Sequence, residues 1–348
     1  MFPARAAADA LLERGWQVRL VTDARGAAHA RDFPGGDPIV IQAQSPFQKH
    51  PLKFAAALAS LARGYGQTRA AMRDFQPSVV AGFGGYPAFP VLAAARAGGT
   101  PFVIHEQNAV LGRVNRLFAT RAAYVASGFD RLDRLSDKAS RVVVGNPVRA
   151  GVLKAAETAY AAPEPEGEFR LLVIGGSLGA RLLSVTVPRA VADLPEALRL
   201  RLKVVQQTRP ESLDEARRLY AEAGVEADLA PFFQDMGALY AQAHLVISRA
   251  GASSVSEISA IGRPAIYAPL AIAMDDHQSA NAEASAQAGA AEVITEDDFT
   301  VPRVRASLET AMTDGEALKA QADAARALGR PSAHDHLADL IEAAAEAR

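Results

Sequence analysis

The chain has 348 residues, of which 49% are hydrophobic and 22% charged, and it contains no cysteine. This composition is typical of a globular protein and excludes disordered, collagenous and disulfide-stapled proteins, thiolate metal sites and cysteine nucleophiles. The formal net charge of −2 gives no basic excess of the kind that favours nucleic-acid binding. The sequence lacks an apolar run of about 18 residues, so no membrane-spanning helix is expected, and its charged beginning is unlike a secretory signal.

In the first half, short apolar segments alternate with longer helical segments. The expected strands are Gln17–Thr22, Pro38–Ile41, Ser78–Ala81, Pro101–Ile104 and Tyr124–Ala126. The expected helices lie near Pro51–Asp74, Pro87–Ala97 and Gly112–Ala119. Because strands that alternate with helices form parallel sheets covered on both faces, this half is expected to be a doubly wound α/β domain.

A proline-rich acidic segment, residues 161–168, has neither helical nor strand periodicity and is interpreted as a linker. The alternation then resumes, with expected strands Phe169–Ile174, Leu202–Gln206, Leu245–Ser248, Ala265–Ala268 and Ala291–Ile294. Helices are expected near Arg181–Ala192, Glu211–Ala223, Ser253–Ile261 and Gln278–Ala288, and in the alanine-rich tail from about Val304. The sequence therefore predicts a first domain over residues 1–149, a second over 150–332 and a final helix over 333–348, with the two domains facing one cleft.

The glycine-rich segment Gly175–Arg181 follows an apolar strand and opens a helix. Glycine permits close approach of the backbone, a helix N-terminus offers unpaired N–H groups, and Ser177 adds a hydroxyl, so a phosphate or diphosphate is the expected ligand. A tight turn without a ligand is the alternative. The segment lacks the Gly-Lys-Ser/Thr of a Walker loop, and residues 206–208 lack the acidic residue that holds an NAD ribose, so a dinucleotide enzyme is disfavoured.

Two further segments of the second half carry polar or small residues before a helix. In Ser248–Glu257, small residues permit close approach of a bulky ligand, and Glu257 either complements the helix dipole or accepts two adjacent ribose hydroxyls. Met274–Asn281 offers a dense run of hydrogen-bonding side chains, either as a solvated loop and helix cap or as partners of sugar hydroxyls.

The first half also contains segments that could bind a ligand. Gly82–Pro87 is another candidate anion-binding turn. The run His105-Glu106-Gln107-Asn108 ends a strand, and because four polar side chains are costly to bury without partners, a binding role is favoured over core packing. Arg149, near the domain boundary, is either a surface residue or a bidentate partner of an anion.

The sequence has no histidine or carboxylate pattern typical of a metal site, and it lacks the Asp-x-Asp pair of metal-dependent nucleotide-sugar enzymes. No cofactor is therefore expected, and helix N-termini and arginine would stabilise any diphosphate leaving group.

Residues 49–73 carry basic side chains but no acidic one, together with an apolar set. The basic residues are Lys49, Lys53, Arg63, Arg69 and Arg73. The apolar residues in and just before this segment are Phe47, Leu52, Phe54, Leu58, Leu61, Tyr65 and Met72. The pattern is typical either of a helix that lies on an anionic membrane surface or of a helix packed on the sheet with a solvated basic side.

Together and in this order, the polar and glycine-rich segments resemble the MurG family of bacterial peptidoglycan synthesis, the undecaprenyl-diphospho-muramoylpentapeptide N-acetylglucosaminyltransferases. The matching segments are Gly82–Pro87, His105–Asn108, Gly145–Arg149, Gly175–Arg181, Phe232–Met236, Arg249–Glu257 and Asp276–Asn281. They span nearly the whole chain, so the match is more specific than any single glycine loop. The resemblance implies an α/β GT-B fold of two doubly wound Rossmann-like domains, with the final helix packed back on the first domain.

The resemblance also implies a metal-independent hexosyltransferase. Such an enzyme moves N-acetylglucosamine from UDP-N-acetylglucosamine to the 4-hydroxyl of lipid I, undecaprenyl-diphospho-N-acetylmuramoyl-pentapeptide, with inversion, and the product is lipid II. The implied location is the cytoplasmic face of the bacterial inner membrane, held peripherally at an anionic surface, with cell-wall and division proteins as further partners.

Carried over by position, Ser177 would contact the diphosphate and the backbone at Phe233 the uracil. The segment that would line the nucleotide consists of Ala252, Ser253, Ser254, Val255, Ser256 and Glu257. Within it, Glu257 would bind the ribose, and Gln278 would hold sugar hydroxyls. Asn108 and Arg149 would reach the donor across the cleft.

One departure from the family concerns the beginning of the chain. The family begins with a strand and a loop of the form Gly-Gly-Thr-Gly-Gly-His, whose histidine is a candidate general base, and this chain starts just after that histidine. A sheet without this strand is expected to contain unpaired backbone groups and an apolar gap. A start codon assigned too late is favoured over a real truncation, because every later motif is intact. Within the chain, His105 and Glu106 are the remaining candidates for acid–base catalysis.

Two other hypotheses stay open at this point. The first is another nucleotide-sugar enzyme of the same fold, such as a UDP-N-acetylglucosamine 2-epimerase or a glycolipid glycosyltransferase. The second is a non-catalytic scaffold that binds the donor without turnover.

Overall fold

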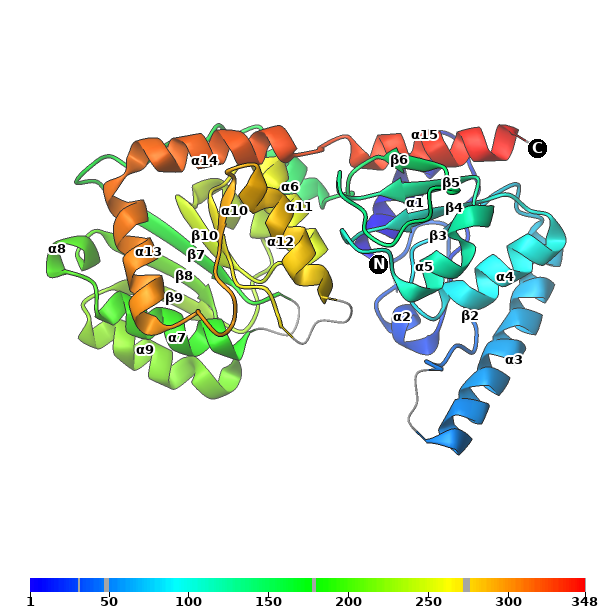
Figure 1. The fold of residues 1–348 in the computed structure, drawn as a ribbon, viewed down its shortest axis with the longest axis horizontal. Helices are drawn as coiled ribbons and strands as arrows, with labels where there is room; N and C mark the ends of the chain where they lie inside the picture. Colours follow the sequence, from blue (N-terminus) through cyan, green and yellow to red (C-terminus); the bar gives the residue numbers. More distant parts are fainter. Residues whose placement is uncertain (31, 47–49, 177–179, 272–275, 348) are drawn as a thin grey trace. The chain divides into compact units, whose positions relative to one another are not determined.

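The computed structural model describes residues 1–30, 32–46, 50–176, 180–271 and 276–347. The chain divides into two compact units, unit 1 with residues 1–147 and 332–348, and unit 2 with residues 148–331. The sequence analysis places the corresponding boundaries after residues 149 and 332. Figure 1 shows both units, with the last helix of the chain in unit 1.

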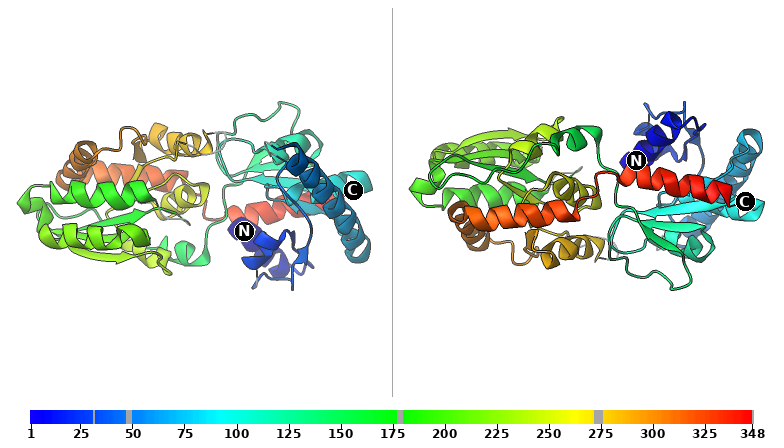
Figure 2. Two further views of the ribbon diagram at one scale, coloured as in Figure 1. Left: turned by 90° about the horizontal axis from the view of Figure 1, so that it is seen from below. Right: turned by 90° about the horizontal axis from the view of Figure 1, so that it is seen from above.

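Unit 1 contains a set of short parallel strands and the helices that surround them (Figures 1 and 2). Its strands are β1 (Val21–Thr22), β2 (Ile39–Val40), β3 (Val80–Gly82), β4 (Phe102–Glu106), β5 (Tyr124–Ser127) and β6 (Arg141–Val143). Its helices are α1 (Phe2–Glu13), α2 (Ala24–Ala28), α3 (Pro51–Phe75), α4 (Ala88–Gly98), α5 (Arg113–Phe118), the 3-10 turn η1 (Ala119–Arg121) and α15 (Ala333–Glu346).

The strands of unit 1 form two separate parallel sheets, β1-β2 and β3-β4-β5-β6. The four-stranded sheet is covered on both faces. Apolar residues of α1 and α15, such as Leu11, Leu337 and Ile341, share a core with Val103 of β4. Another core joins Leu92 of α4 to β3 and β4. Figure 2 shows α1 beside α15, although they come from opposite ends of the chain.

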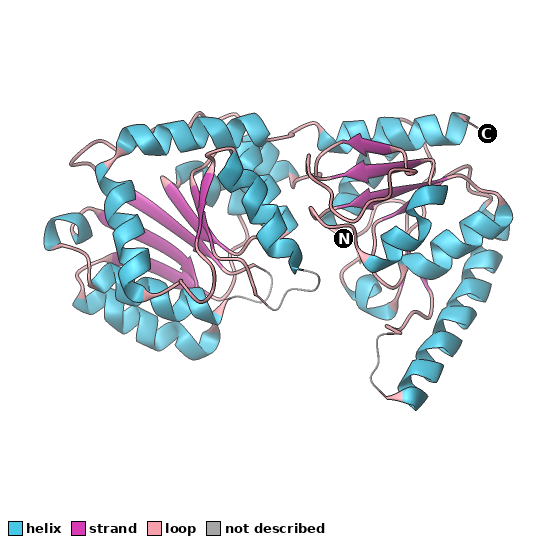
Figure 3. Ribbon diagram, in the orientation of Figure 1, coloured by secondary structure: helices cyan, strands magenta, loops and turns pink. Residues whose placement is uncertain are grey.

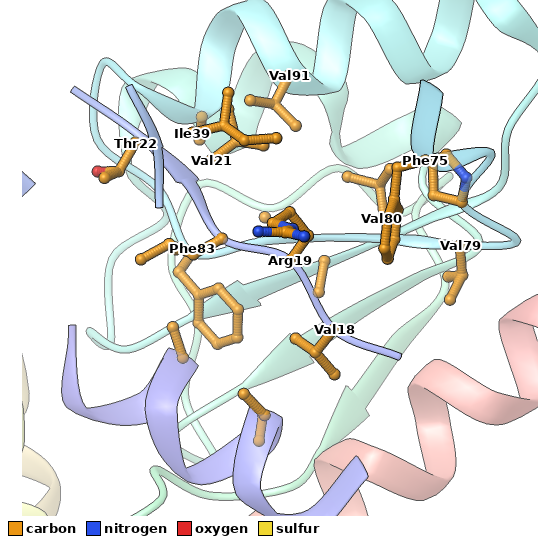
Figure 4. A pocket seen from close by; sticks show the side chains of 18 of the residues that line it. Val18, Arg19, Val21, Thr22, Ile39, Phe75, Val79, Val80, Phe83 and Val91 are labelled. Atoms are coloured by element: carbon orange, nitrogen blue, oxygen red, sulfur yellow. The ribbon is translucent and has the colours of Figure 1, made fainter. Parts of the chain in front are cut away.

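A cavity of about 480 Å³ separates the two sheets of unit 1 (Figure 4). It is lined by residues of the β1–β2 side, by β3, and by parts of α1 and α4, and the labelled side chains around it are mostly valine, isoleucine and phenylalanine. β1 and β3 are both edge strands here, so each presents one row of backbone groups that the ladder does not pair. The cavity lies where the sequence predicts an apolar gap in this sheet.

Unit 2 contains six strands and the remaining helices of the described chain. Its strands are β7 (Phe169–Ile174), β8 (Leu202–Gln207), β9 (Glu226–Ala230), β10 (Leu245–Ser248), β11 (Ala265–Tyr267) and β12 (Ala291–Val293). Its helices are α6 (Ala150–Ala155), α7 (Arg181–Ala192), α8 (Glu196–Arg199), the 3-10 turn η2 (Pro210–Ser212), α9 (Leu213–Glu222), α10 (Met236–Gln242), α11 (Ala252–Ile261), α12 (His277–Gln287), α13 (Val301–Thr313) and α14 (Gly315–Leu328).

The sheet of unit 2 is entirely parallel, with the order β12-β11-β10-β7-β8-β9. Helices cover both of its faces (Figure 3). One group comprises α7, α9 and α13, and the other comprises α6, α10, α11, α12 and α14. The central strand β7 is buried along most of its length, as expected for its apolar sequence. The predicted doubly wound α/β architecture is therefore confirmed.

The sequence analysis misses several short elements. The edge strands β6 and β9 each carry charged or exposed residues and show no apolar run. Residues 2–13 form α1, to which the sequence analysis assigns no structure, and the tail from Val304 divides into α13, α14 and α15. The expected strand Gln17–Thr22 is regular only at Val21–Thr22.

Candidate functional site

The sheet of unit 2 changes direction between its two central strands. From β7 the chain proceeds outward to β8 and β9, and from its neighbour β10 it proceeds to β11 and β12 on the other side. The loops that follow β7 and β10 therefore diverge above the same edge of the sheet. In open α/β sheets, ligands bind at the carboxyl ends of the strands at such a switch point.

The loop after β7 is fixed at its beginning by Gln207. The Gly175 amide donates to Gln207 Oε1 at 3.0 Å, and Gln207 Nε2 donates to the Pro231 carbonyl at 3.0 Å. Gly176 follows with a φ of 79°, a conformation that only glycine adopts at no cost. Ser177, the predicted diphosphate ligand, lies outside the described residues.

The loop after β10 ends at the N-terminus of α11. Gly251 is the N-cap residue, and as a glycine it has no side chain that could cap this end of the helix. The first N–H groups of a helix have no intrahelical acceptor, so those of Ala252, Ser253 and Ser254 are suited to an anion. The Val255 amide already donates to the Gly251 carbonyl at 3.0 Å, and its side chain is buried. The side chain of Val255 thus packs in the core, and its predicted place in the nucleotide lining stays a prediction.

Glu257 lies in the second turn of α11 and forms a bidentate ion pair with Arg149. Arg149 Nε donates to Glu257 Oε1 at 2.6 Å, and a terminal guanidinium nitrogen donates to Oε2 at 2.5 Å. Tyr240 Oη lies 3.5 Å from Oε2. Hydrogen bonding to Glu257 raises the pKa of Arg149 above the usual value for arginine. Burial raises the pKa of Tyr240 well above the usual value for tyrosine.

Arg149 is the N-cap residue of α6 and belongs to unit 2. The sequence analysis places it in the first domain, from which it would reach the donor across a cleft. The structure corrects this placement, since Arg149 and Glu257 lie in the same unit. The sequence analysis considers Arg149 as a bidentate arginine and Glu257 as a bidentate acceptor. In the structure both side chains have bidentate geometry, but each is the partner of the other.

Arg249, a buried arginine just after β10, belongs to a matching segment of the sequence analysis, which assigns it no role. Its guanidinium donates to the carbonyls of Ala268 and Pro269 and to Glu296 Oε1 at 2.5 Å. Glu296 Oε2 in turn accepts the Ala271 amide at 3.0 Å. Arg249 and Glu296 therefore position the loop after β11. The signal in the sequence that could have indicated a role for Arg249 was its position next to a strand end. Its partner Glu296, however, lies 47 residues further along the chain.

The other predicted donor residues lie in loops or at helix ends of unit 2. Phe233 is half-buried in the loop between β9 and α10. Gln278 is half-buried in the first turn of α12, and its Oε1 accepts the Leu270 amide at 3.0 Å. The neighbouring Asn281 donates to the Ala250 carbonyl at 3.1 Å and supports the loop before α11. Ser253 is exposed, and Ala252, Ser254 and Ser256 are half-buried.

His105 lies at the buried end of β4 in unit 1. Gln107 Nε2 lies 3.1 Å from His105 Nδ1 and is a donor, so the ring hydrogen is on Nε2, which donates to the Gly145 carbonyl at 3.0 Å. Burial lowers the pKa of His105 to about 4, although the hydrogen bond to Gly145 opposes this shift. A neutral ring with both nitrogens bonded holds strand ends together. This geometry favours a structural role for His105, and its role in acid–base catalysis stays a prediction.

Glu106 is buried beside His105, and both of its oxygens accept hydrogen bonds from the following loop. Oε1 accepts the backbone and side-chain N–H groups of Asn108 at 3.1 and 3.3 Å. Oε2 accepts the Gly112 amide at 2.9 Å and Asn115 Nδ2 at 2.8 Å. These contacts join Glu106 to the following loop and to α5 and favour a structural role. Its catalytic role stays a prediction. Asn108 is half-buried in that loop.

Within the described ranges, no group of three histidine or acidic side chains could hold a metal ion. The cavity of unit 1 is lined by none of the predicted donor residues. The arrangement in unit 2, with a glycine at the N-cap of α11 and a buried carboxylate in the next turn, is suited to a ligand that carries both an anionic group and hydroxyl groups.

Comparison with known proteins gives matches over both halves of the chain. The glycosyltransferase family 28 N-terminal domain matches residues 1–127, and the glycosyltransferase family 28 C-terminal domain matches residues 170–337. A UDP-N-acetylglucosamine--N-acetylmuramyl-(pentapeptide) pyrophosphoryl-undecaprenol N-acetylglucosamine transferase from Maricaulis maris is 57% identical over 344 residues, which cover 98% of this chain and 94% of the relative. The transferase of the same name from Caulobacter vibrioides is 48% identical and covers 98% of this chain and 95% of its own.

This chain belongs to the MurG family.

A MurG of known structure, from Acinetobacter baumannii, has a TM-score of 0.80 at 30% identity and covers 98% of this chain and 95% of its own. The predicted GT-B fold, with two parallel α/β domains, is confirmed by this likeness. A putative UDP-N-acetylglucosamine 2-epimerase from Listeria monocytogenes has a TM-score of 0.69 at 16% identity, with 99% and 94% of the two chains covered, and shares the fold alone. The MurG family and a glycosyltransferase activity are therefore established for the chain.

Proposed function

We propose that this chain transfers N-acetylglucosamine from UDP-N-acetylglucosamine to the 4-hydroxyl of lipid I, with inversion, to give lipid II. One observation carries the proposal. At the switch point of unit 2, the buried carboxylate of Glu257 lies in the second turn of a helix whose N-cap residue is Gly251, which has no capping side chain. This arrangement supports a ligand with a ribose diol and a diphosphate, and the names of the relatives specify a UDP-sugar of this kind.

In the proposed complex, the diphosphate lies at the N-terminus of α11, where the amides of Ala252, Ser253 and Ser254 donate to it. Glu257 accepts the ribose hydroxyls, and the backbone near Phe233 faces the uracil. Gln278 binds hydroxyls of the sugar, and Asn108 is the proposed contribution of unit 1. Ser177, which lies outside the described residues, is proposed to donate to the diphosphate.

The reaction is a single displacement at the anomeric carbon. The 4-hydroxyl oxygen of the acceptor attacks this carbon and loses its proton to a base, while the bond to the β-phosphate oxygen breaks and its electron pair leaves with UDP. Attack from the face opposite the leaving group inverts the configuration. We propose that the helix N-terminus and Arg149 stabilise the departing diphosphate, so that no metal ion is needed.

The proposal places the protein on an anionic membrane surface, with α3 as the contact element. Among the described helices, none is both long and apolar enough to cross a membrane. α3 presents exposed apolar side chains at its beginning, with Leu52 75%, Phe54 45% and Leu58 48% exposed. Lys53, also exposed, lies among them. This mixture of apolar and basic side chains supports a peripheral contact with an anionic membrane surface. The cytoplasmic face of the inner membrane, and cell-wall and division proteins as partners, are proposed from the family resemblance alone.

A transfer assay tests the function directly. The chain is incubated with UDP-N-acetylglucosamine labelled in the sugar and with a lipid I analogue in detergent, and the lipid fraction is counted. Label in the lipid fraction, dependent on the acceptor and lost in Glu257→Ala, is expected. Free N-acetylmannosamine formed without acceptor would indicate an epimerase, and donor binding without transfer would indicate a non-catalytic scaffold. Either result would overturn the proposal.

A further inference from the structure

The carboxylate proposed to bind the ribose already has a bidentate partner in this structure. Arg149 donates to both oxygens of Glu257, at 2.6 and 2.5 Å. The exposed fractions of the two side chains differ, with 32% for Arg149 and 6% for Glu257. The arginine therefore forms the outer half of the pair, between the buried carboxylate and the solvent from which a ligand arrives.

A guanidinium edge and a ribose diol offer a carboxylate the same pattern of hydrogen bonds. Each presents two donors side by side, two N–H groups in the first case and two O–H groups in the second, and each pairs with the two oxygens of one carboxylate. The carboxylate lies in a confined position, with Tyr240 within 3.5 Å of Oε2. A ribose that approached both oxygens from the solvent would meet the guanidinium first.

We propose that Arg149 is a resident substitute for the ribose, and that donor binding exchanges it from Glu257 to the diphosphate. This inference rests on the proposed function, because it takes Glu257 as the ribose ligand. In the exchange, two neutral O–H donors replace the guanidinium at the carboxylate. The positive charge moves to the diphosphate, which carries more negative charge than Glu257.

The positions of the two residues explain why such an exchange is feasible. Glu257 is buried, and a buried carboxylate without a partner is strongly disfavoured, so the empty site needs a donor pair. Arg149 provides it from the N-cap of α6, two residues after the boundary between the units. Because its side chain is long and partly exposed, it can withdraw without opening the core around α11. The binding site is thereby kept paired both with and without its ligand.

The exchange has an unusual consequence for two ligands that differ in their phosphates. Uridine has the diol but no phosphate, so it must displace Arg149 without offering it a new partner. UDP-N-acetylglucosamine displaces Arg149 and then binds it. Removing the guanidinium should consequently strengthen uridine binding and weaken binding of the full donor.

The test is calorimetric titration of the full chain and of Arg149→Ala with uridine, 2′-deoxyuridine and UDP-N-acetylglucosamine at pH 8. For the variant, we expect uridine affinity to rise on the order of tenfold and UDP-N-acetylglucosamine affinity to fall on the order of tenfold, as for loss of a charged hydrogen-bonding group. The affinity for 2′-deoxyuridine, which lacks the diol, should change little. Arg189→Ala is the matched control, because Arg189 forms an exposed ion pair with Glu215 in the same unit. It should leave all three affinities unchanged.

Uridine affinity that is unchanged or weaker in Arg149→Ala would overturn the exchange. Circular dichroism shows whether Arg149→Ala is folded. If it is not, Arg149→Lys provides the same test, and its uridine affinity should rise by an intermediate amount. Failure of the proposed function is distinguishable from failure of the exchange. In that case the wild-type chain would not bind UDP-N-acetylglucosamine, and Glu257→Gln would not change the affinity for uridine.

Discussion

At the scale of single residues, buried polar side chains act chiefly as ties between loops at the carboxyl ends of strands. Glu106 holds Asn108, Gly112 and Asn115, while Gln207 joins Gly175 to Pro231. The cost of burying each polar group is offset by these hydrogen bonds. The sequence indicates that residues 105–108 cannot be buried without partners, but it does not indicate that these partners include the Gly145 carbonyl and Asn115 of α5. The hydrogen bonds explain how His105 and Glu106 are buried, and their catalytic roles stay predictions.

His105 gives a prediction at this scale. Its folded pKa of about 4 lies below the ordinary value of 6.5, so the unfolded chain binds the proton more readily and acid favours unfolding. The contribution of His105 to stability is fully present above pH 6.5 and is lost as pH falls toward 4. Between pH 7 and pH 5 it should lower the free energy of unfolding by about 2 kcal/mol. Urea titrations at the two pH values measure this, and the loss should be absent in His105→Gln. An imidazole NMR titration of His105 with a midpoint near 6.5 would contradict the account.

At the scale of secondary-structure elements, α3 shows two different environments along one helix. Its middle packs through Ala57, Leu61 and Gly64, and its first turns expose Leu52 and Phe54. The basic and apolar pattern left two interpretations open, a packed helix and a membrane-surface helix. One face of α3 packs on α4, as expected for a packed helix. The exposed start of the helix remains available for contact with a membrane surface.

The membrane contact is tested with vesicles that contain anionic lipid. Phe54→Ser should weaken vesicle binding on the order of tenfold, because the ring no longer enters the interface. Charge reversal at Lys53 should weaken it further and reduce its salt dependence. Leu117→Ser is the matched control, since Leu117 is a 64% exposed apolar residue of unit 1 outside α3. Equal effects of Phe54→Ser and Leu117→Ser in a sedimentation assay would argue against α3 as the contact element.

At the scale of the whole molecule, the two ends of the chain are built into the same unit. Trp16 Nε1, just after α1, donates to Glu342 Oε1 at 2.6 Å, and Arg14 pairs with Asp339 and Glu342 of α15. Leu337 of α15 is fully buried in the core that it shares with α1. The last helix therefore contributes to the stability of unit 1, although unit 2 directly precedes it in sequence.

Leu337→Ala should destabilise unit 1 by about 2–5 kcal/mol, the usual cost of a cavity at a buried leucine. Because Leu337 packs in the core of unit 1 and the proposed donor site lies in unit 2, affinity for UDP-N-acetylglucosamine should persist. In Leu337→Ala, differential scanning calorimetry should show a lower midpoint temperature for one of two unfolding transitions. Leu117→Ala, the control, should change the free energy of unfolding of either unit by no more than about 0.5 kcal/mol. Simultaneous loss of donor binding and of both transitions would show that the units do not fold separately.

The alternation of apolar and helical segments was sufficient to predict the parallel sheets, and β7, β10 and α7 begin and end at the predicted residues. β6 and β9 were not predictable in this way, because edge strands bury little and carry few apolar residues. The site was predicted as individual residues with roles carried over from the family, but without the contacts that these residues make with one another. The mutual pairing of Arg149 and Glu257 joins residues 108 positions apart, and no local pattern specifies it.

The most direct test of the account is a calorimetric titration of the chain with UDP-N-acetylglucosamine, with UDP-N-acetylgalactosamine and NAD as controls. The account predicts saturable binding at one site, selective for UDP-N-acetylglucosamine and strongly weakened in Glu257→Ala. The absence of binding by a chain that circular dichroism shows to be folded, or equal affinity for NAD, would contradict the donor site at the N-terminus of α11.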